Sequence, residues 1–359
     1  MCHNGIVVET SPKEGTIQME VSMIGIDLAK SVFQVHGVDG SGAVVVRRKL
    51  RRSQVLGFFS RLAPCVVGME ACGTAHHWAR ELIALGHEVR LVPPSYVKAY
   101  VKRGKNDAVD AAAICEAAGR PTMRFVPVKS AAQQGELAMH RSRELLIKQR
   151  TMLINALRSQ MAEFGVISPQ GRAGLKVLLE VLHDRQETRL PDAARMALLE
   201  LAAAIAALAP RIAALDKAIG KSVRANPIAA KLMTIPSIGP ITASAIVATV
   251  GDPAAFRNGR HFAAWLGLVA KQHSTAGKQR LGRISKMGDR YLRKLLVLGA
   301  TSKLRTAATG KTPLDAWTRR LLEHKPRRLV TVALANKTAR ILWAVMAGND
   351  HYRPERAAA

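Results

Sequence analysis

The order of strand-like and helix-like segments over residues 22–125 constrains the fold of this chain more than any other feature. Five runs have the composition of β-strands, at residues 23–26, 32–38, 43–46, 65–69 and 88–92. Three segments have the apolar spacing of helices, at residues 53–62, 74–85 and 107–118. In chain order they predict β-β-β-α-β-α-β-α, an α/β domain in which a mixed sheet carries helices on its faces.

Four carboxylates occupy matched places in this pattern. Asp27 follows the first predicted strand and Glu70 ends the fourth. Asp107 and Asp110 lie three residues apart on the last helix and face the same side. Because the first and fourth strands of such a sheet are neighbours and the last helix packs across them, we expect the four side chains to converge. The alternative is that each acid acts alone, with Asp27 in a turn and Asp107 as a helix N-cap.

Clustered carboxylates repel one another, so they stay ionised together only with cations between them. Hard oxygen ligands of this kind select Mg²⁺ or Mn²⁺. Two such ions about 4 Å apart would hold a scissile phosphate and stabilise the charge that develops on it. The four acids therefore predict a metal site for phosphodiester chemistry.

The charge of the chain points to a polyanionic partner. Lysine and arginine number 54 and aspartate and glutamate 26, which gives a formal net charge of +28. Nucleic acid is the partner that most often offsets such self-repulsion. A hydrophobic fraction of 48% is enough for buried cores and excludes a chain that is disordered throughout.

Cysteine usage and hydropathy favour the cytoplasm. The four cysteines are not spaced as CxxC, so we expect neither a zinc site nor a disulfide framework. We find no run of roughly 18 apolar residues, and residues 1–20 lack an apolar signal core. We therefore expect a cytoplasmic, nucleoid-associated protein with no membrane partner.

Residues 129–225 have the composition of long helices. Seven apolar residues alternate spacings of three and four, as in a coiled coil or a long helical hairpin: Leu198, Leu201, Ile205, Leu208, Ile212, Leu215 and Ile219. Pro210 lies inside this seam and is expected to kink or break the helix. The seam predicts either an intramolecular hairpin or a subunit interface, and the sequence leaves both open.

Two features of the C-terminal region predict phosphate contacts. Residues 231–240 join two helical segments through a turn with Pro236 and Gly239, as in a helix-hairpin-helix, where turn amides and a helix N-terminus meet a phosphate. Residues 271–293 carry seven cations and one acid. The predicted nucleic-acid-binding set is Gly239, Lys271, Lys278, Arg280, Arg283, Lys286, Arg290 and Arg293.

Several segments resemble one family of bacterial insertion-sequence transposases. Three are similar to its DEDD signature: GIDLAK (25–30), MEACG (69–73) and KNDAVDA (105–111). Three more are similar to its C-terminal transposase domain: IPSIG (235–239), HSTAGK (273–278) and ISKMGDRYLR (284–293). The resemblance covers residues 22–300 and identifies the family as the RNA-bridged DEDD/serine recombinases.

The resemblance implies a ribonuclease H-like (RuvC-like) N-terminal domain, a coiled coil, and a mainly helical domain with a nucleophilic serine. It implies catalytic, metal-binding roles for Asp27, Glu70, Asp107 and Asp110. It also implies a homo-oligomer (dimer or tetramer) and a noncoding guide RNA that pairs with donor and target double-stranded DNA. The predicted parts are an N-terminal extension (1–21), the RuvC-like domain (22–128), the coiled-coil region (129–226), the serine transposase domain (227–345) and a tail (346–359).

Three hydroxyls compete for the role of the nucleophile: Ser274, Thr275 and Ser285. Ser274 is preferred because it lies in a polar loop beside Gly277, where a hydroxyl can reach DNA. Ala276 stands where relatives often carry glycine, which leaves the local register open. Ser285 is also explained as the cap of the helix that runs through Tyr291.

Two other functions fit the same residues. One is a RuvC-type, structure-selective DNA endonuclease that uses water, and the other is a nucleic-acid-binding protein with an inactive nuclease fold. The complete acid quartet weighs against the second. A recombinase would combine acids and serine from different domains, so we expect cutting only after nucleic acid has brought the domains together. A covalent protein–DNA adduct would separate a recombinase from a nuclease.

Overall fold

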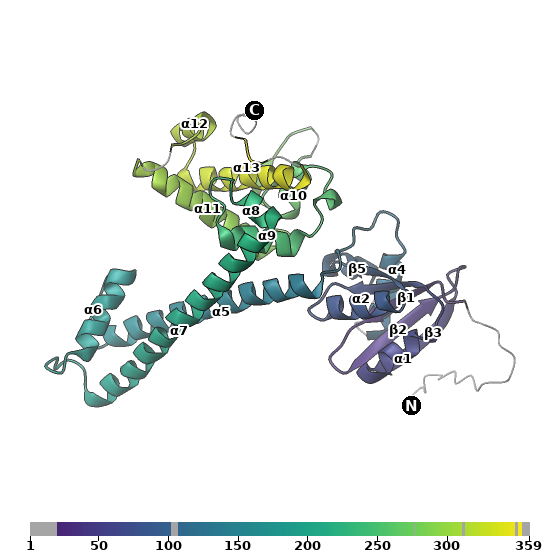
Figure 1. Ribbon diagram of the computed structural model, residues 1–359, viewed down its shortest axis with the longest axis horizontal. Coiled ribbons are helices and arrows are strands. Elements are labelled where there is room, and N and C mark those ends of the chain that lie inside the picture. The colour runs from purple at the N-terminus through teal and green to yellow at the C-terminus, as the bar shows by residue number, and fades with distance from the viewer. Residues whose placement is uncertain (1–19, 102–106, 276, 311–312, 349–350, 354–359) are drawn as a thin grey trace. The chain divides into compact units, whose positions relative to one another are not determined.

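The computed structural model describes residues 20–101, 107–275, 277–310, 313–348 and 351–353 (Figure 1). The chain forms two compact units, Met1–Ala131 and Ala132–Ala359. The second unit holds both the helical region and the C-terminal domain that the sequence separates. Residues 1–19 of the predicted N-terminal extension lie outside the described residues.

The first unit is built on a five-stranded mixed sheet in the order β3-β2-β1-β4-β5. Its strands are β1 (Met23–Asp27), β2 (Val32–Val38), β3 (Val44–Arg51), β4 (Val66–Glu70) and β5 (Glu88–Val92). The first three strands are antiparallel neighbours, whereas β4 runs parallel to both β1 and β5. The predicted mixed sheet, with its first and fourth strands side by side, is therefore confirmed.

Strand β3 is longer than its sequence pattern indicates, because we expected it to end at residue 46. It continues through three exposed cations, Arg47, Arg48 and Lys49, to the buried Leu50. This strand forms one edge of the sheet. Charged side chains on an edge strand oppose pairing with another sheet, so a strand of this kind reads as a loop in the sequence.

Helices cover both faces of the sheet (Figure 1). They are α1 (Val55–Phe59), α2 (Ala75–Ala84), α3 (Pro94–Val97) and α4 (Asp107–Ala118), with 3-10 turns at Arg52–Gln54 and Lys98–Tyr100. The bounds of α4 agree with the prediction, whereas α1 is shorter and α3 was not predicted. Alternation along β1 sends Ile24 and Ile26 into a core with Phe59 and Trp78 of α1 and α2.

Helix α4 packs on the opposite face, where two glycines make room for it. Gly25 of β1 and Gly68 of β4 are register partners. A Cβ on Gly25 would lie 2.2 Å from the carbonyl oxygen of Ala111, and a Cβ on Gly68 would lie 2.5 Å from the Cβ of Ala118. The helix therefore lies closer to β1 and β4 than any larger residue would allow.

The second unit begins with three helices: α5 (Ala131–Ala162), α6 (Arg172–His183) and α7 (Asp192–Ala225). Leu157 and Met161 of α5 share a buried cluster with Leu198 and Ile205 of α7. An ion pair between Arg143 and Asp216 also joins these two helices. The intramolecular packing that the seam predicts is thus present, and a subunit interface on the same helices stays a prediction.

Pro210 does not break α7, which is one helix from Asp192 to Ala225. Proline removes one hydrogen bond, to the carbonyl group of Ala206. Both residues lie on the exposed side of α7, where water can satisfy that carbonyl group. Leu208 and Ile212 are buried on the opposite side and hold the helix in place across the proline.

The rest of the second unit packs around one large core. Its elements are α8 (Pro227–Leu232), α9 (Pro240–Val250), a 3-10 turn (Pro253–Ala255), α10 (Gly259–Trp265), β6 (Ala270–Gln272), β7 (Leu281–Ile284), α11 (Arg290–Ala308), α12 (Ala316–His324) and α13 (Arg327–Ala347). The element predicted to resemble a helix-hairpin-helix consists of α8, α9 and the turn between them. Their turn packs against α11, because a Cβ on Gly299 would lie 2.4 Å from the carbonyl oxygen of Ser237.

Helices α7 and α13 are long and apolar enough, by length and composition, to cross a membrane. The sequence analysis found no segment of this kind, because neither helix is an uninterrupted run of apolar residues. Core helices of soluble proteins pass the same test, and each of these helices buries a face in the protein. For α13 the buried face includes Val330, Leu334 and Leu342.

Candidate metal centre and nucleic-acid interface

Three of the four predicted carboxylates meet at the end of the central strand β1. Asp27 is the last residue of β1, and Asp107 and Asp110 belong to the first turn of α4. One carboxylate oxygen from each lies within 4.8 Å of the others. The close approach of α4 to Gly25 brings the first turn of the helix to the end of β1. Asp107 is the first residue of α4, and the residue before it lies outside the described residues, so its alternative role as an N-cap stays a prediction.

Glu70 lies outside this group of three but belongs to the same electrostatic cluster. It is the last residue of β4, the parallel neighbour of β1. The pKa of Asp27 is raised, first by burial and then by three carboxylates: Asp110, Asp107 and Glu70. Burial and the charge of Asp110 also raise the pKa of Glu70. Each of these carboxylates thus makes ionisation of Asp27 more costly.

The negative charge of the cluster is not neutralised by the described part of the chain. No ion pair joins any of the four carboxylates to a basic side chain of the described residues. The donors are all oxygen atoms and three of them lie within reach of one small ion. This chemistry fits a hard divalent cation.

Ser274 lies on the exposed connection between β6 and β7, which form an antiparallel hairpin. Its Oγ accepts hydrogen bonds from the side-chain amide of Gln272, at 3.0 Å, and from the backbone N–H of Arg280, at 3.2 Å. The hydroxyl therefore has a fixed position at the surface. The loop expected around Ser274 is confirmed, although the two short strands that support it were not predicted.

The two competing hydroxyls have different surroundings. Thr275 is exposed on the same loop, and its carbonyl oxygen accepts from the N–H of Lys278 at 3.0 Å. Ser285 is half-buried, and its Oγ accepts from the N–H of Met287 at 3.4 Å. It does not cap α11, whose N-cap is Asp289. Ala276 lies outside the described residues.

Six of the seven predicted phosphate-binding cations are exposed: Lys271, Lys278, Arg280, Arg283, Lys286 and Arg290. Arg293 differs, because one guanidinium nitrogen donates to the carbonyl oxygens of Leu266, at 2.9 Å, and Met287, at 3.3 Å. It therefore ties α11 to the preceding loop. Gly239 is the exposed N-cap of α9, with space around its Cα.

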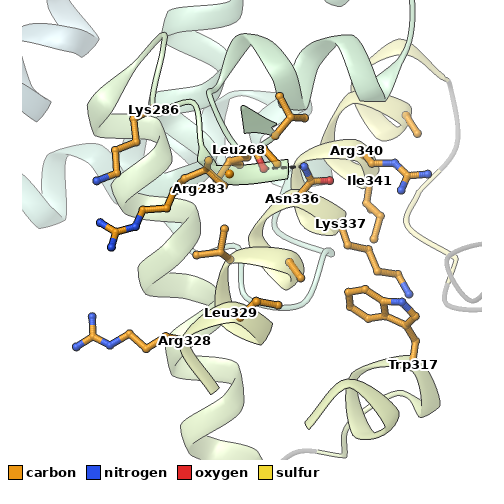
Figure 2. Close-up of a pocket in the computed structure, with 17 residues that line it drawn as sticks. Leu268, Arg283, Lys286, Trp317, Arg328, Leu329, Asn336, Lys337, Arg340 and Ile341 are labelled. Carbon is orange, nitrogen blue, oxygen red and sulfur yellow. Dashed lines mark hydrogen bonds between the residues drawn. The ribbon is translucent and has the colours of Figure 1, made fainter. Parts of the chain in front are cut away.

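Three basic residues of α13 line a cavity to which the sequence analysis assigned no role. Arg328, Lys337 and Arg340 line a cavity of about 1300 Å³ together with Arg283 and Lys286 of the hairpin region (Figure 2). The available signal was the second apolar stripe of α13, which recurs every three or four residues and is flanked by cations.

The family of the chain follows from comparison with known proteins. A family model described as "Transposase", of the DEDD type found in IS110 elements, matches residues 24–165. The model described as "Transposase IS116/IS110/IS902 family" matches residues 229–314. A Pseudomonas aeruginosa protein named "Probable family 20 transposase" is 52% identical over 94% of this chain and 100% of its own length. The chain belongs to the IS116/IS110/IS902 transposase family.

Two further relatives agree. The transposase for insertion sequence element IS1328 of Yersinia enterocolitica is 38% identical over 90% of this chain and 96% of its own length. The transposase for element IS1111A of Coxiella burnetii is 35% identical over 93% of this chain and 92% of its own length. This transposase is therefore a DNA-cutting and rejoining enzyme. Its DEDD-type domain and its acidic cluster both suggest divalent-metal use.

Proposed function

We propose that this transposase is an RNA-guided DNA recombinase that combines metal-binding carboxylates with a serine nucleophile. The observation that carries the proposal is the convergence of Asp27, Asp107 and Asp110 where β1 ends. In an insertion-sequence transposase, an acidic cluster of this kind is suited to phosphodiester cleavage. Donor and target double-stranded DNA are the substrates in this proposal.

The first unit is assigned in this proposal to the ribonuclease H-like (RuvC-like) fold. The assignment is supported by three antiparallel strands followed by two parallel ones, in the order β3-β2-β1-β4-β5. It is also supported by the positions of Asp27 and Glu70 at the ends of the neighbouring strands β1 and β4. The long helices α5 and α7 would be the coiled coil of the family.

Asp27, Asp107 and Asp110 would hold Mg²⁺ or Mn²⁺, with Glu70 completing the ligand set from β4. A bound divalent cation supplies Lewis-acid stabilisation of the charge that develops on the phosphate. The protein's own contribution is to bring Asp27, Asp107 and Asp110 together at the end of β1, with Glu70 at the end of the neighbouring strand β4. Only a bound cation would offset the repulsion between the ionised carboxylates. The cluster therefore suits ligand binding and lowers the stability of the metal-free fold.

Ser274 is the proposed nucleophile. Its Oγ would attack phosphorus, forming a phosphoseryl ester as the bond to one deoxyribose oxygen breaks, and that oxygen would take up a proton. The ester conserves the energy of the broken bond, so strands can be rejoined without ATP. In the described residues the Oγ only accepts hydrogen bonds, from Gln272 and Arg280, so its own proton can pass to a base.

The guide RNA is proposed from the family resemblance and from the charge of the chain. A net charge of +28 suits a protein that carries more than one nucleic acid. The sequence has no recognisable base-reading module, such as a zinc finger, which agrees with delegating sequence choice to base pairing. A cytoplasmic homo-oligomer, a dimer or a tetramer, would carry this RNA to donor and target DNA.

A RuvC-type endonuclease that uses water is the second candidate function. One observation favours it: the acids and Ser274 belong to different compact units, so the acidic cluster is complete without the serine. A nuclease of this kind would leave free strand ends.

Trapping on a suicide DNA substrate distinguishes the two functions. We expect mass spectrometry to find DNA linked to a peptide that contains Ser274, and Ser274→Ala to lose the adduct while keeping DNA binding. A link at Thr275 or Ser285 would move the nucleophile. Cleavage without an adduct on any hydroxyl would establish the nuclease instead.

The metal site has its own test. Asp27→Asn and Glu70→Gln keep side-chain size but remove charge, so we expect each to abolish cleavage while circular dichroism shows an intact fold. Asp39→Asn, an exposed acid in the β2–β3 turn of the same unit, is the matched control and should keep activity. Near-normal cleavage by the first two variants would contradict the proposed metal site.

A further inference from the structure

Helix α13 has two apolar faces, and only one of them is buried in the core. Val330, Leu334 and Leu342 lie in the core of the second unit. Leu329 and Val332 lie on the other face, which lines the cavity of about 1300 Å³ between α13 and the β6–β7 hairpin. Leu329 is 51% exposed. Val332 and Ala333 line the same cavity, and continuous apolar surface bordered by charged groups, unlike a single exposed leucine, is typical of a binding surface.

Positive charge borders this apolar floor on two sides. Figure 2 shows Arg283, Lys286 and Arg328 along one side of the cavity and Arg340 and Lys337 on the other. The described lining contains no aspartate or glutamate. The floor between the two basic rims is formed by apolar residues of α13, by Leu268, and by Asn336, whose side-chain amide donates to the carbonyl oxygen of Leu268 at 3.0 Å (Figure 2).

Four of these cations have no acidic partner among the described residues. Arg283, Lys286, Arg328 and Arg340 are exposed and form no ion pair with an acid of the described chain. Lys337 is different, since its Nζ lies 4.7 Å from the centre of the Trp317 ring and 3.9 Å from Asp315. The rim thus has one anchored cation and four available for an anionic ligand.

The cavity adjoins the proposed nucleophile through strand β7. Arg283 lies on β7 and lines the cavity. The same hairpin connection carries Ser274, held by the backbone N–H of Arg280. A chain-like ligand that lies along the cavity would therefore lead towards the Ser274 loop.

We propose that this groove, between α13 and the β6–β7 hairpin, binds a single-stranded segment of nucleic acid. The phosphates would contact the arginine and lysine rims, and unstacked bases would lie against the apolar floor. A duplex hides the faces of its bases and cannot use such a floor, whereas a single strand presents them. The proposal rests on the proposed recombinase function and adds the kind of strand that this unit holds.

Binding of labelled strands to the full chain tests the groove. Fluorescence anisotropy is measured in EDTA at several salt concentrations, with a single-stranded 20-nucleotide DNA, RNA of the same sequence, and the corresponding DNA duplex. The groove variant is Arg328→Gln with Arg340→Gln. The control is Arg319→Gln with Arg320→Gln, which removes the same charge from exposed positions on α12 outside the groove lining.

We expect the groove variant to lose roughly tenfold in affinity for single strands and about 1.4 units of salt slope, or 0.7 for each phosphate contact. The control should change affinity less than twofold. Leu329→Glu, which places a carboxylate on the floor, should weaken single-strand binding and leave duplex binding unchanged. Stronger loss for RNA than for DNA would assign the groove to the guide, and the reverse would assign it to a displaced DNA strand.

Two results would overturn the proposal. Equal losses in the groove and control variants would show that only overall charge matters. Equal losses for duplex and single strand, with no effect of Leu329→Glu, would show that the floor contacts no bases. The assay contains no divalent cation and no cleavage step, so absence of a Ser274 adduct would count against the proposed function without changing this result.

Discussion

At the scale of single residues, Asp27 shows why the acidic cluster needs a ligand. Burial and the neighbouring carboxylates raise its pKa in the folded chain. Below the pKa of an unfolded aspartate both states are protonated and the cluster has no cost. As the pH rises towards the higher folded pKa, the folded protein binds more protons than the unfolded one, so stability falls. In the metal-free protein, Asp27 therefore lowers the free energy of unfolding most at neutral pH.

Asp27→Asn should accordingly stabilise the metal-free protein. We expect the melting temperature in EDTA at pH 7 to rise by roughly 1–3 °C, with the difference vanishing near pH 3. The amide oxygen can still accept the backbone hydrogen bond from Leu28. Mg²⁺ should raise the melting temperature of the wild type and have little effect on the variant. Thermal unfolding between pH 3 and 8 measures both.

Asp39→Asn should change stability in the opposite direction to Asp27→Asn, within the same unit. The Ser41 hydroxyl and nearby backbone amides lower the pKa of Asp39, so its charge favours folding above the unfolded pKa, and that contribution is lost as the pH falls. Its amide variant should be slightly less stable at neutral pH. If Asp27→Asn destabilised the protein in EDTA as Asp39→Asn does, the repulsion within the cluster would be insignificant.

Arg293 marks the limit of reading single residues from sequence. It belongs to the same run of cations as the other basic residues of 271–293, yet it donates to two backbone carbonyls.

Replacing Arg280, Arg283 and Lys286 by glutamine should flatten the salt dependence of DNA binding by up to about three units. Arg293→Gln should lower thermal stability and leave that slope unchanged. A triple variant with the wild-type slope would show that these side chains face only solvent.

At the scale of elements, the position of α4 depends on Gly25. The Cβ of Gly25→Ala would meet the carbonyl oxygen of Ala111 at 2.2 Å and the backbone nitrogen of Cys115 at 2.5 Å. Backbone atoms cannot rotate away, so α4 must move outward and take Asp107 and Asp110 from Asp27. We expect a loss of about 1–3 kcal/mol in the free energy of unfolding and loss of the stabilisation by Mg²⁺.

Gly57→Ala is the control for this change. Gly57 lies within α1 and a Cβ there would meet no atom within 4 Å. Alanine favours a helix over glycine by about 1 kcal/mol, so stability should stay equal or rise. Urea unfolding of both variants, with and without Mg²⁺, gives the comparison. Unchanged metal stabilisation in Gly25→Ala would mean that α4 can move without opening the acidic cluster.

The elements that carry the acids could be predicted because each has a local signal. Strands β2 and β5 and helix α4 have the predicted bounds, since their apolar periodicity and the turn residues around them agree. The rest depends on tertiary context. Strand β3 is held by pairing with β2 despite its three cations, and α7 continues through Pro210 because its opposite side is packed. The β6–β7 hairpin is short and exposed, so no apolar pattern in the sequence predicts it.

The candidate site divides in the same way. Convergence of Asp27, Asp107 and Asp110 follows from the order of the strands, which the sequence determines. The position of Glu70 outside the group of three and the hydrogen bonds of Arg293 to backbone carbonyls depend on side-chain geometry. The cations of α13 were not assigned to a site because their spacing along the helix does not show that they meet Arg283 and Lys286 in the folded chain.

At the scale of the whole molecule, each compact unit has cores of its own. The sheet of the first unit packs Ile24, Phe33 and Trp78 on one face and Ile114 on the other. The second unit has one core near the N-terminus of α7, around Leu198, and a larger one around Leu296. The proposed ligands also divide between the units, with the divalent cation in the first and the single strand in the second.

Calorimetry of the full chain should therefore show two separable unfolding transitions. Gly25→Ala should lower only the transition of the first unit. Leu296→Ala, which empties a side chain that is 1% exposed on α11, should lower only that of the second, by about 2–5 kcal/mol. Once the transitions are assigned in this way, Mg²⁺ should raise the first and single-stranded DNA in EDTA should raise the second, because a ligand stabilises only the unit whose folded state binds it. A single transition that both ligands raise equally would mean that the units unfold as one, and an effect of Mg²⁺ on the second alone would place the metal site outside the acidic cluster of β1 and α4.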